Sequence, residues 1–453
     1  MVDAIPLDLH SGRSMKPISK LRFDSLAGYT RSPTMRLSAR ELGWFEEADE
    51  KVLGVLVLDL PDNDYACYVL GRDAKGRFRT VWIDCSIPTA EKACARLETK
   101  LAEYAQMPPA EFYQGDEVGK PLDFFTPVVE AEKQHPNFRA LISGRGYSPA
   151  LGLLAEMMHY FEDADGNFVQ QFQSTGFDAR LWELYLYALF TELGYGFNRE
   201  HAAPDFHCQG LLGEFFLEAT TVNPSDIAPA LDDSTRQAYL EHYVPIKFGS
   251  ALFTKLKKRY WELPHVGGYP LVFAVQDFHA PRSMIWSSSA LVEYLYGIRQ
   301  VERKRADGFA EIVSEPVETY MWEGKEIPAG FFLQPDTENI SAVLANPSGT
   351  ISKFNRIGFL SGFGDRDIRM LRKGICYRDA LMPQEFADEV HSPDYRETWC
   401  EGLSVYHNPR ANQPLFADAI PGAAHHSSRD GRILSRLPWF HPVASVTCIV
   451  AAT

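Results

Sequence analysis

The middle of the chain alternates apolar helices with short apolar strands, and this order constrains the fold most. Gly194 and Gly196 stop the first helix, and Ser287 begins the last one. An alternation of this kind is typical of α/β proteins, so we expect an α/β core. The pattern predicts helices over 177–193, 244–263 and 287–298, and strands over 204–208, 213–222 and 269–278.

The regions on either side of this core have a mixed character. Between residues 51 and 84, three β-rich runs are separated by turn signals, and an amphipathic helix follows over 89–106. A Pro-rich stretch over 106–140 suits a domain connection, and strand-like runs recur at 331–334 and 340–346. We therefore expect three parts: an α+β N-terminal domain over 1–140, the core over 141–300 and a C-terminal α+β region over 301–453.

Composition argues against several classes of protein. No run approaches the roughly 18 apolar residues of a membrane-spanning helix, so we expect no membrane partner. The first residues lack the pattern of a secretory signal, which favours a cytoplasmic protein. The seven cysteines are scattered without a CxxC pair, as expected for reduced thiols. The net charge of −15 argues against a general coat for nucleic acid but permits a local basic groove.

Three acidic residues of the core have surroundings that favour a function. Glu183 lies in the apolar helix 177–193, where a carboxylate needs a partner, a water or a metal. Asp205 starts one strand, and Glu218 follows the apolar run of the next. Two carboxylates on adjacent strands can converge on one cation, and hard oxygen ligands suit magnesium or manganese. Each acid alone fits an ordinary structural role, whereas the three in this order favour a metal site.

The order of these acids resembles the PD-(D/E)XK nuclease superfamily. The resemblance covers roughly residues 177–277: Glu183 matches the helix acid, Pro204 and Asp205 match the PD pair, and Glu218 begins the (D/E)XK segment. It implies a restriction-endonuclease-like αβββαβ core and a nuclease that depends on a divalent metal. This hydrolase would cut DNA in preference to RNA, as an endonuclease with a role in genome defence.

The same resemblance implies which groups hold the metal. The Asp205 and Glu218 carboxylates and the Ala219 backbone carbonyl would bind Mg²⁺ or Mn²⁺, and Glu183 would support the ion directly or through water. Thr220 is a departure, because the superfamily motif has a lysine at this position. The resemblance implies that this lysine orients the attacking water, so another lysine must replace it if the protein is active.

The helix after the motif contains the predicted substitute. At about 100° per residue, Lys255 lies at the edge of the face formed by Phe248, Leu252, Leu256 and Tyr260, whereas Lys257 points away. We predict that the nitrogen of Lys255 lies within roughly 6 Å of a Glu218 carboxylate oxygen, close enough for a useful Coulomb interaction. The predicted catalytic residues are therefore Glu183, Asp205, Glu218 and Lys255.

Two basic segments predict a local groove for nucleic acid. The stretch 247–259 has five Lys or Arg residues and no acid, and 353–378 has seven against two acids. Basic side chains of this kind contact phosphates, although a solvated surface is the alternative for any one of them. The predicted nucleic-acid-binding residues are Lys247, Lys258, Arg259, Lys353 and Arg356.

Other interpretations stay open at this point. One is a non-catalytic nucleic-acid-binding or assembly protein on a decayed nuclease fold, with Thr220 as the trace of decay. A second metal site can be drawn from the C-terminal histidines, but their spacing matches no zinc pattern. These histidines are His407, His425, His426 and His441. The sequence also leaves open whether the protein is a homo-oligomer.

Overall fold

The computed structural model describes residues 15–163, 166–225, 235–305, 310–379 and 382–450. It is a mixed α/β structure, as predicted, and it divides into two compact units. The first unit comprises 1–174 with 354–366, and the second comprises 175–353 with 367–453. The predicted boundary near residue 140 thus differs from the unit boundary, and most of the C-terminal region belongs to the same unit as the core.

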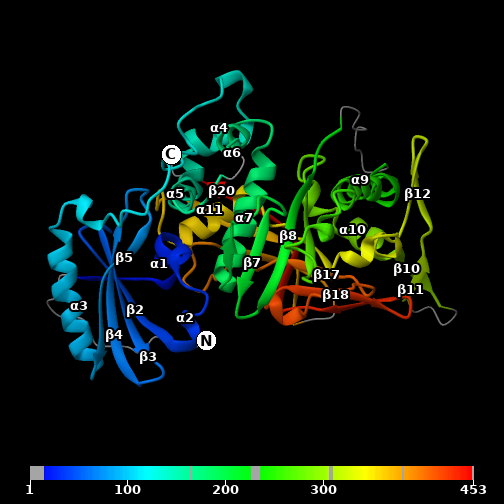
Figure 1. The fold of residues 1–453 in the computed structure, drawn as a ribbon. Helices are drawn as coiled ribbons and strands as arrows, with labels where there is room; N and C mark the ends of the chain where they lie inside the picture. The colour runs from blue at the N-terminus through cyan, green and yellow to red at the C-terminus, as the bar shows by residue number, and fades with distance from the viewer. Residues whose placement is uncertain (1–14, 164–165, 226–234, 306–309, 380–381, 451–453) are drawn as a thin grey trace. The chain divides into compact units, whose positions relative to one another are not determined.

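The first unit is built on an antiparallel sheet in the order β1-β2-β3-β4-β5 (Figure 1). Its strands are β1 Lys16–Ile18, β2 Ala39–Glu47, β3 Val52–Asp59, β4 Asp64–Arg72 and β5 Phe78–Ile87. Helix α3, Ala90–Ala105, lies across one face and buries Leu97 and Leu101 against the sheet. Gly54 permits this close approach, because a Cβ there would meet Leu101 at 2.8 Å. The predicted strands and helix are found, whereas β1 and β2 were not predicted.

Six further α-helices complete the described part of this unit. They are α1 Lys20–Ala27, α2 Met35–Ser38, α4 Pro136–Ser143, α5 Ser148–Met157, α6 Phe168–Gln173 and α11 Ile351–Leu360, the last of which begins at the unit boundary. Ser19 caps α1 by accepting a hydrogen bond from the Arg22 backbone N–H.

The second unit contains a mixed sheet in the order β19-β18-β17-β14-β9-β8-β7-β6. Strands β6, β7 and β8 are antiparallel neighbours, and β8, β9 and β14 run parallel. The bounds are β6 Gly196–Asn198, β7 Phe206–Gly210, β8 Gly213–Val222, β9 Leu271–Asp277, β14 Ala342–Ala345, β17 Ser404–His407, β18 Ala424–Arg429 and β19 Arg432–Arg436. Smaller sheets pair β10 Ile298–Lys304 with β11 Ala310–Pro316, β12 Thr319–Trp322 with β13 Lys325–Pro328, and β15 Arg369–Arg378 with both β16 Gln384–Glu389 and β20 Phe440–Val450.

Helices cover both faces of the large sheet, which explains why β9 is buried at every position. These helices are α7 Phe177–Leu193, α9 Val244–Leu256 and α10 Ser288–Tyr296, and the short α8 Arg236–Ala238 precedes α9. Phe273 and Val275 of β9 share a core cluster with residues of α9 and α10, which lie side by side (Figure 1). The Trp182 ring nitrogen of α7 donates to the Ala274 carbonyl.

Two predicted elements differ from the structure. Residues 331–334 are not a strand, because Phe331–Leu333 form a 3₁₀ turn in which neighbouring Phe331 and Phe332 enter the same core cluster. A strand would send consecutive side chains to opposite faces. The helix expected to reach residue 263 ends at Leu256, and Arg259 then takes a left-handed φ of 51°.

Candidate active site

The hairpin of β7 and β8 brings Asp205 and Glu218 together. Phe206 pairs with Leu217, so Asp205, the residue before β7, lies across from Glu218. The Asp205 backbone N–H donates to Glu218 Oε2 at 3.2 Å, and Asp205 Oδ2 accepts from the Ala219 N–H at 2.7 Å. A two-residue turn between Gly210 and Gly213 sets this register. The two acids therefore occupy neighbouring strand positions, as the sequence predicts.

Lys255 reaches the same place from the last turn of α9. Its Nζ donates to Glu218 Oε1 at 2.5 Å, which is within the separation predicted from the sequence. The Glu218 side chain is 5% exposed and that of Lys255 is 25% exposed, so the pair is only partly open to solvent. A long lysine stem can lie along apolar neighbours while its ammonium group enters a polar site.

Tyr260 is a member of this site that sequence reasoning missed. Its hydroxyl donates to Glu218 Oε1 at 2.7 Å. Burial, followed by the negative charge of Glu218, raises the pKa of Tyr260, so the phenol stays a hydrogen-bond donor. The helical projection placed Tyr260 on a buried helix face, but the left-handed Arg259 ends that helix and redirects the chain. Nothing in an arginine signals this conformation, because residues other than glycine adopt it rarely.

Glu183 contributes a third carboxyl group from α7. Arg180 Nη1 donates to both of its oxygens, at 2.9 and 2.8 Å. Burial raises the pKa of Glu183, and the guanidinium of Arg180 opposes that rise. Arg180 was also missed, although its position three residues before Glu183 on one helix face is a signal that could have found it.

The charges of these acids act on one another. The pKa of Asp205 is raised to about 8, first by burial and then by the negative charges of Glu218 and Glu183. Lys255 and the hydrogen bond from the Ala219 N–H act in the opposite direction. Crowded carboxyl groups of this kind are typical of sites that hold a cation or perform acid–base chemistry.

The donor set has the chemistry of a magnesium or manganese site. In the described part of the chain, no group of three or more His, Cys, Asp or Glu side chains is arranged to hold a metal ion. Mg²⁺, however, is usually bound through one or two carboxylates together with water and substrate phosphates. Asp205 and Glu218 supply two such carboxylates at adjacent strand positions. The participation of the Ala219 carbonyl stays a prediction.

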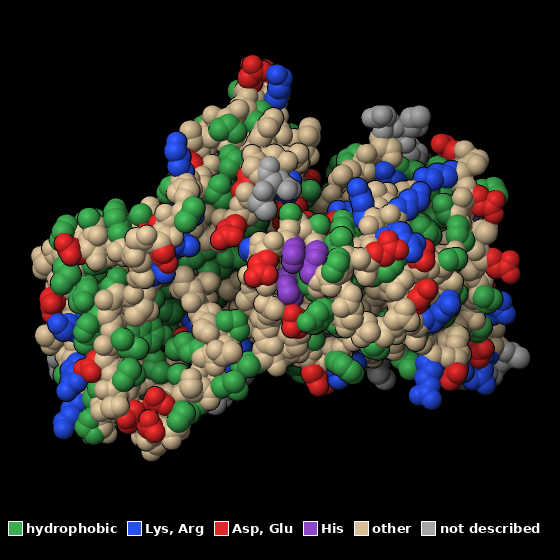
Figure 2. All heavy atoms as spheres, in the orientation of Figure 1, with side chains coloured by type: hydrophobic (Ala, Val, Ile, Leu, Met, Phe, Trp, Pro, Cys, Tyr) green, Lys and Arg blue, Asp and Glu red, His purple; other side chains and the backbone are tan. Residues whose placement is uncertain are grey.

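The predicted nucleic-acid contacts near α9 differ in exposure. Lys258 and Arg259 are exposed just beyond the helix, where Lys and Arg side chains gather over α9 (Figure 2). Arg259 forms ion pairs with Glu262 at 2.7 Å and Asp336 at 2.8 Å. Lys247 is partly buried, and its Nζ donates to Ser225 Oγ at 2.7 Å. Lys258 is therefore the most accessible of the three for a phosphate.

Lys353 and Arg356 correct the prediction of a second basic segment on the surface. Lys353 is fully buried; its Nζ donates to the Glu401 carbonyl at 2.8 Å and lies 3.4 Å from Glu397. Arg356 is only 2% exposed. A phosphate contact requires an accessible side chain, so the prediction is wrong for both residues. Lys353 can be buried because it pairs with Glu397, a buried acid more than 40 residues away in the sequence.

Replacing Lys353 with methionine is expected to reduce the free energy of unfolding by about 1.5–3 kcal/mol, the contribution of a hydrogen bond made by a charged group. The loss is limited because Glu397 keeps the Arg372 guanidinium, 3.5 Å away. Urea unfolding of the full chain measures this loss. Lys257→Met is the control, since Lys257 is exposed and its change should stay within about 0.5 kcal/mol. If Lys353→Met has unchanged stability but binds DNA more weakly, the original prediction that Lys353 contacts nucleic acid would be supported.

The four C-terminal histidines form no metal site among the residues that the structure describes. His407 Nε2 lies 2.9 Å from His425 Nδ1, and His426 Nδ1 lies 2.8 Å from Ser435 Oγ. Burial lowers the pKa of all four, to about 4 for His441 and His407 and to about 3 for His426. These histidines are therefore neutral in the folded protein at neutral pH.

This neutrality predicts acid sensitivity. Below pH 6.5 His441 binds a proton in the unfolded chain but stays neutral in the folded chain until about pH 4. The unfolded state then holds more protons, so lowering the pH through this window favours unfolding. At about 1.4 kcal/mol per pKa unit, His441 alone should remove about 3 kcal/mol. Urea unfolding at several pH values measures this loss. The free energy of unfolding should depend less steeply on pH for His441→Gln than for the wild type, and equal slopes for the two proteins would contradict the prediction.

The site thus combines side chains from the β7–β8 hairpin, from the helices α7 and α9 and from the turn that follows α9. Among the described residues, no helix has both the length and the apolar character required to cross a bilayer. No family model, curated protein or solved structure matches the chain.

Proposed function

We propose that the protein is a divalent-metal-dependent nuclease that cleaves nucleic acid, DNA in preference to RNA. The observation that carries the proposal is the Lys255 ammonium, 2.5 Å from Glu218 Oε1. Thr220, on the same strand as Glu218, cannot supply a positive charge. A lysine from α9 supplies that charge instead, which favours an active site over a decayed one.

The order of the elements supports the proposal. Helix α7, strands β6, β7 and β8, helix α9 and strand β9 follow one another in the order of an αβββαβ core, with the short α8 before α9. Asp205 directly precedes the second of these strands, and Glu218 lies on the third. These are the positions at which the PD-(D/E)XK resemblance requires the two acids.

Four residues of the site, and two lysines beside it, then have a chemical role. Asp205 and Glu218 would hold Mg²⁺ or Mn²⁺, which supplies an activated water and polarises the scissile phosphate when bound. Lys255 places a positive charge where negative charge develops on the phosphodiester. Tyr260 donates to Glu218 Oε1 and so fixes the orientation of that carboxylate. Lys257 and Lys258, exposed just after α9, suit contacts with the phosphates of the substrate.

Cleavage by the purified full chain tests the proposal. Supercoiled plasmid, single-stranded DNA and RNA are each incubated with Mg²⁺, with Mn²⁺ or with EDTA. We expect cleavage with either cation and none with EDTA, and faster cleavage of DNA than of RNA. Binding without cleavage under every condition would favour the alternative, a non-catalytic nucleic-acid-binding protein.

A further inference from the structure

A cavity in the same unit as the candidate active site lies between the large sheet, α10 and β20. Its volume is about 520 Å³, within the range of small-molecule sites. Phe248 of α9 lines this cavity, and Lys255 lies seven residues further along the same helix, about 10 Å along its axis. The cavity and the candidate active site therefore share a helix but use different side chains.

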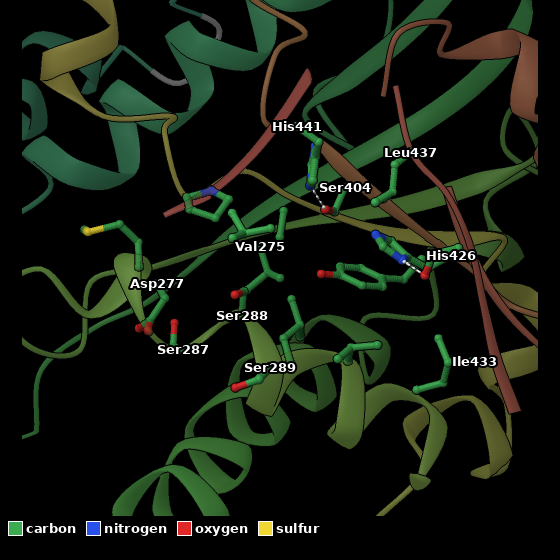
Figure 3. A pocket seen from close by; sticks show the side chains of 18 of the residues that line it. Val275, Asp277, Ser287, Ser288, Ser289, Ser404, His426, Ile433, Leu437 and His441 are labelled. Carbon is green, nitrogen blue, oxygen red and sulfur yellow. Dashed lines mark hydrogen bonds between the residues drawn. The ribbon is translucent and has the colours of Figure 1, made fainter. Parts of the chain in front are cut away.

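Three residues that line this cavity each leave one buried polar atom without a hydrogen bond in the described part of the chain: Asp277 Oδ2, His426 Nε2 and His441 Nδ1. Asp277 and His441 are each only 3% exposed. Figure 3 shows Asp277 beside the serines at the start of α10, with the two histidines on the other side of the cavity. An unsatisfied buried polar atom costs about 1–3 kcal/mol, so three around one cavity point to a ligand that pairs with them.

The protein holds the other polar atom of each residue in place. Asp277 Oδ1 accepts from the His279 backbone N–H at 3.0 Å and lies 2.7 Å from His279 Nδ1. His426 Nδ1 is bonded to Ser435 Oγ, and His441 Nε2 lies 3.5 Å from Ser404 Oγ. These contacts hold the three side chains in place, and the unpaired atoms are buried beside the wall of the cavity.

Charge limits the chemistry of this ligand. Among the described lining residues there is no Lys or Arg, and Asp277 is the only acid. Lys247 is near enough to interact electrostatically with Asp277, but it does not line the cavity. A phosphate or carboxylate would thus meet an acid and no lining cation. Asp277 Oδ2 is an acceptor and requires an N–H or O–H donor.

The remaining walls are mainly apolar and suit a flat ring. Val275, Leu291, Ile433 and Leu437 line them, and the Tyr406 ring stacks on His426 with centroids 4.9 Å apart. An amino-substituted aromatic heterocycle combines a flat apolar face, an amino donor for Asp277 and ring nitrogens that can meet the imidazoles. We propose that this cavity binds an uncharged amino-substituted heterocycle of the nucleobase or nucleoside class. This proposal does not depend on the cleavage activity.

Isothermal titration of the full chain with matched nucleosides tests the amino group. Adenosine is compared with inosine, and cytidine with uridine, because each pair exchanges an amino group for an oxo group. We expect one amino member to bind at least tenfold tighter than its oxo partner. Adenosine 5′-monophosphate should bind no tighter than adenosine. No binding of any nucleoside at millimolar concentration, equal affinities within both pairs, or a tenfold gain from the phosphate would overturn the proposal.

Asp277→Asn makes the test sharper. The His279 backbone N–H can only donate, so the asparagine oxygen should keep the place of Oδ1 and the amide nitrogen should take the place of Oδ2. The variant then has a hydrogen-bond donor in place of an acceptor, so it should bind inosine or uridine more tightly than the amino nucleoside of the same pair. Asp62→Asn, at an exposed position, should behave like the wild type. An unchanged preference in a folded Asp277→Asn protein would overturn the proposal. If this variant does not fold, the comparison of matched nucleosides with the wild-type protein still tests the proposal.

Discussion

Asp205→Asn and Glu218→Gln are each expected to reduce divalent-dependent DNA cleavage by more than about 10³-fold. Each change removes one of the two carboxylates that would hold the cation, whose contribution to the transition state is several kcal/mol. Asp205→Asn keeps an oxygen for the bond from the Ala219 N–H, so its melting temperature should change little. Glu218→Gln keeps an oxygen for Lys255 and Tyr260 but loses the acceptor of the Asp205 N–H, so its melting temperature should fall. Rates are therefore compared at a temperature at which both variants are folded.

Glu214→Gln is the matched control for these variants. Glu214 lies on the same strand, four residues before Glu218, and its Oε1 bonds to His207 and Gln209 instead of to the site. We expect this variant to cleave DNA at nearly the wild-type rate under the same conditions. Equal cleavage by the wild type, Asp205→Asn and Glu218→Gln would show that the activity belongs to another site or to a contaminant.

Lys255→Ala is expected to slow cleavage at saturating DNA by about 10²-fold or more, the effect of losing one transition-state donor. Lys257→Ala should leave kcat unchanged and raise KM, because Lys257 is exposed and suits a phosphate contact. The slope of log affinity against log salt should fall by about one for Lys257→Ala. Rates at saturating substrate and binding at several salt concentrations separate the two effects.

A structural role for Lys255 would give a different pattern. If Lys255 only stabilised Glu218, Lys255→Ala would lower the melting temperature while the folded fraction kept its kcat. Lys255→Arg retains the charge and should recover part of the rate if the charge acts on the substrate. An unchanged kcat for Lys255→Ala would place the substitute for the motif lysine elsewhere and would strengthen the non-catalytic interpretation.

Local sequence patterns determined much of the second unit and of its site. The helix over 177–193 and the strand over 213–222 have the predicted bounds, because apolar periodicity and the flanking glycines act over a few residues. The short hairpin placed Asp205 opposite Glu218, and helical periodicity placed Lys255 at the edge of a buried face. The helix, the strand and the hairpin depend on neighbours in the chain, so local patterns were sufficient to predict them. The contact of Lys255 with Glu218 joins residues 37 positions apart, and it was expected because the PD-(D/E)XK resemblance requires a substitute for the motif lysine.

Only the tertiary structure decided the features that join distant segments. Lys353 looks like a surface lysine in the sequence, but its partner Glu397 comes from a distant segment. Tyr260 enters the candidate site because Arg259 adopts a left-handed conformation that its residue type does not signal. Asp277 and His441, more than 160 residues apart, line one cavity because their strands pack in the same unit. Burial and pairing between such segments depend on the complete fold, whereas residue type and periodicity describe only the local chain.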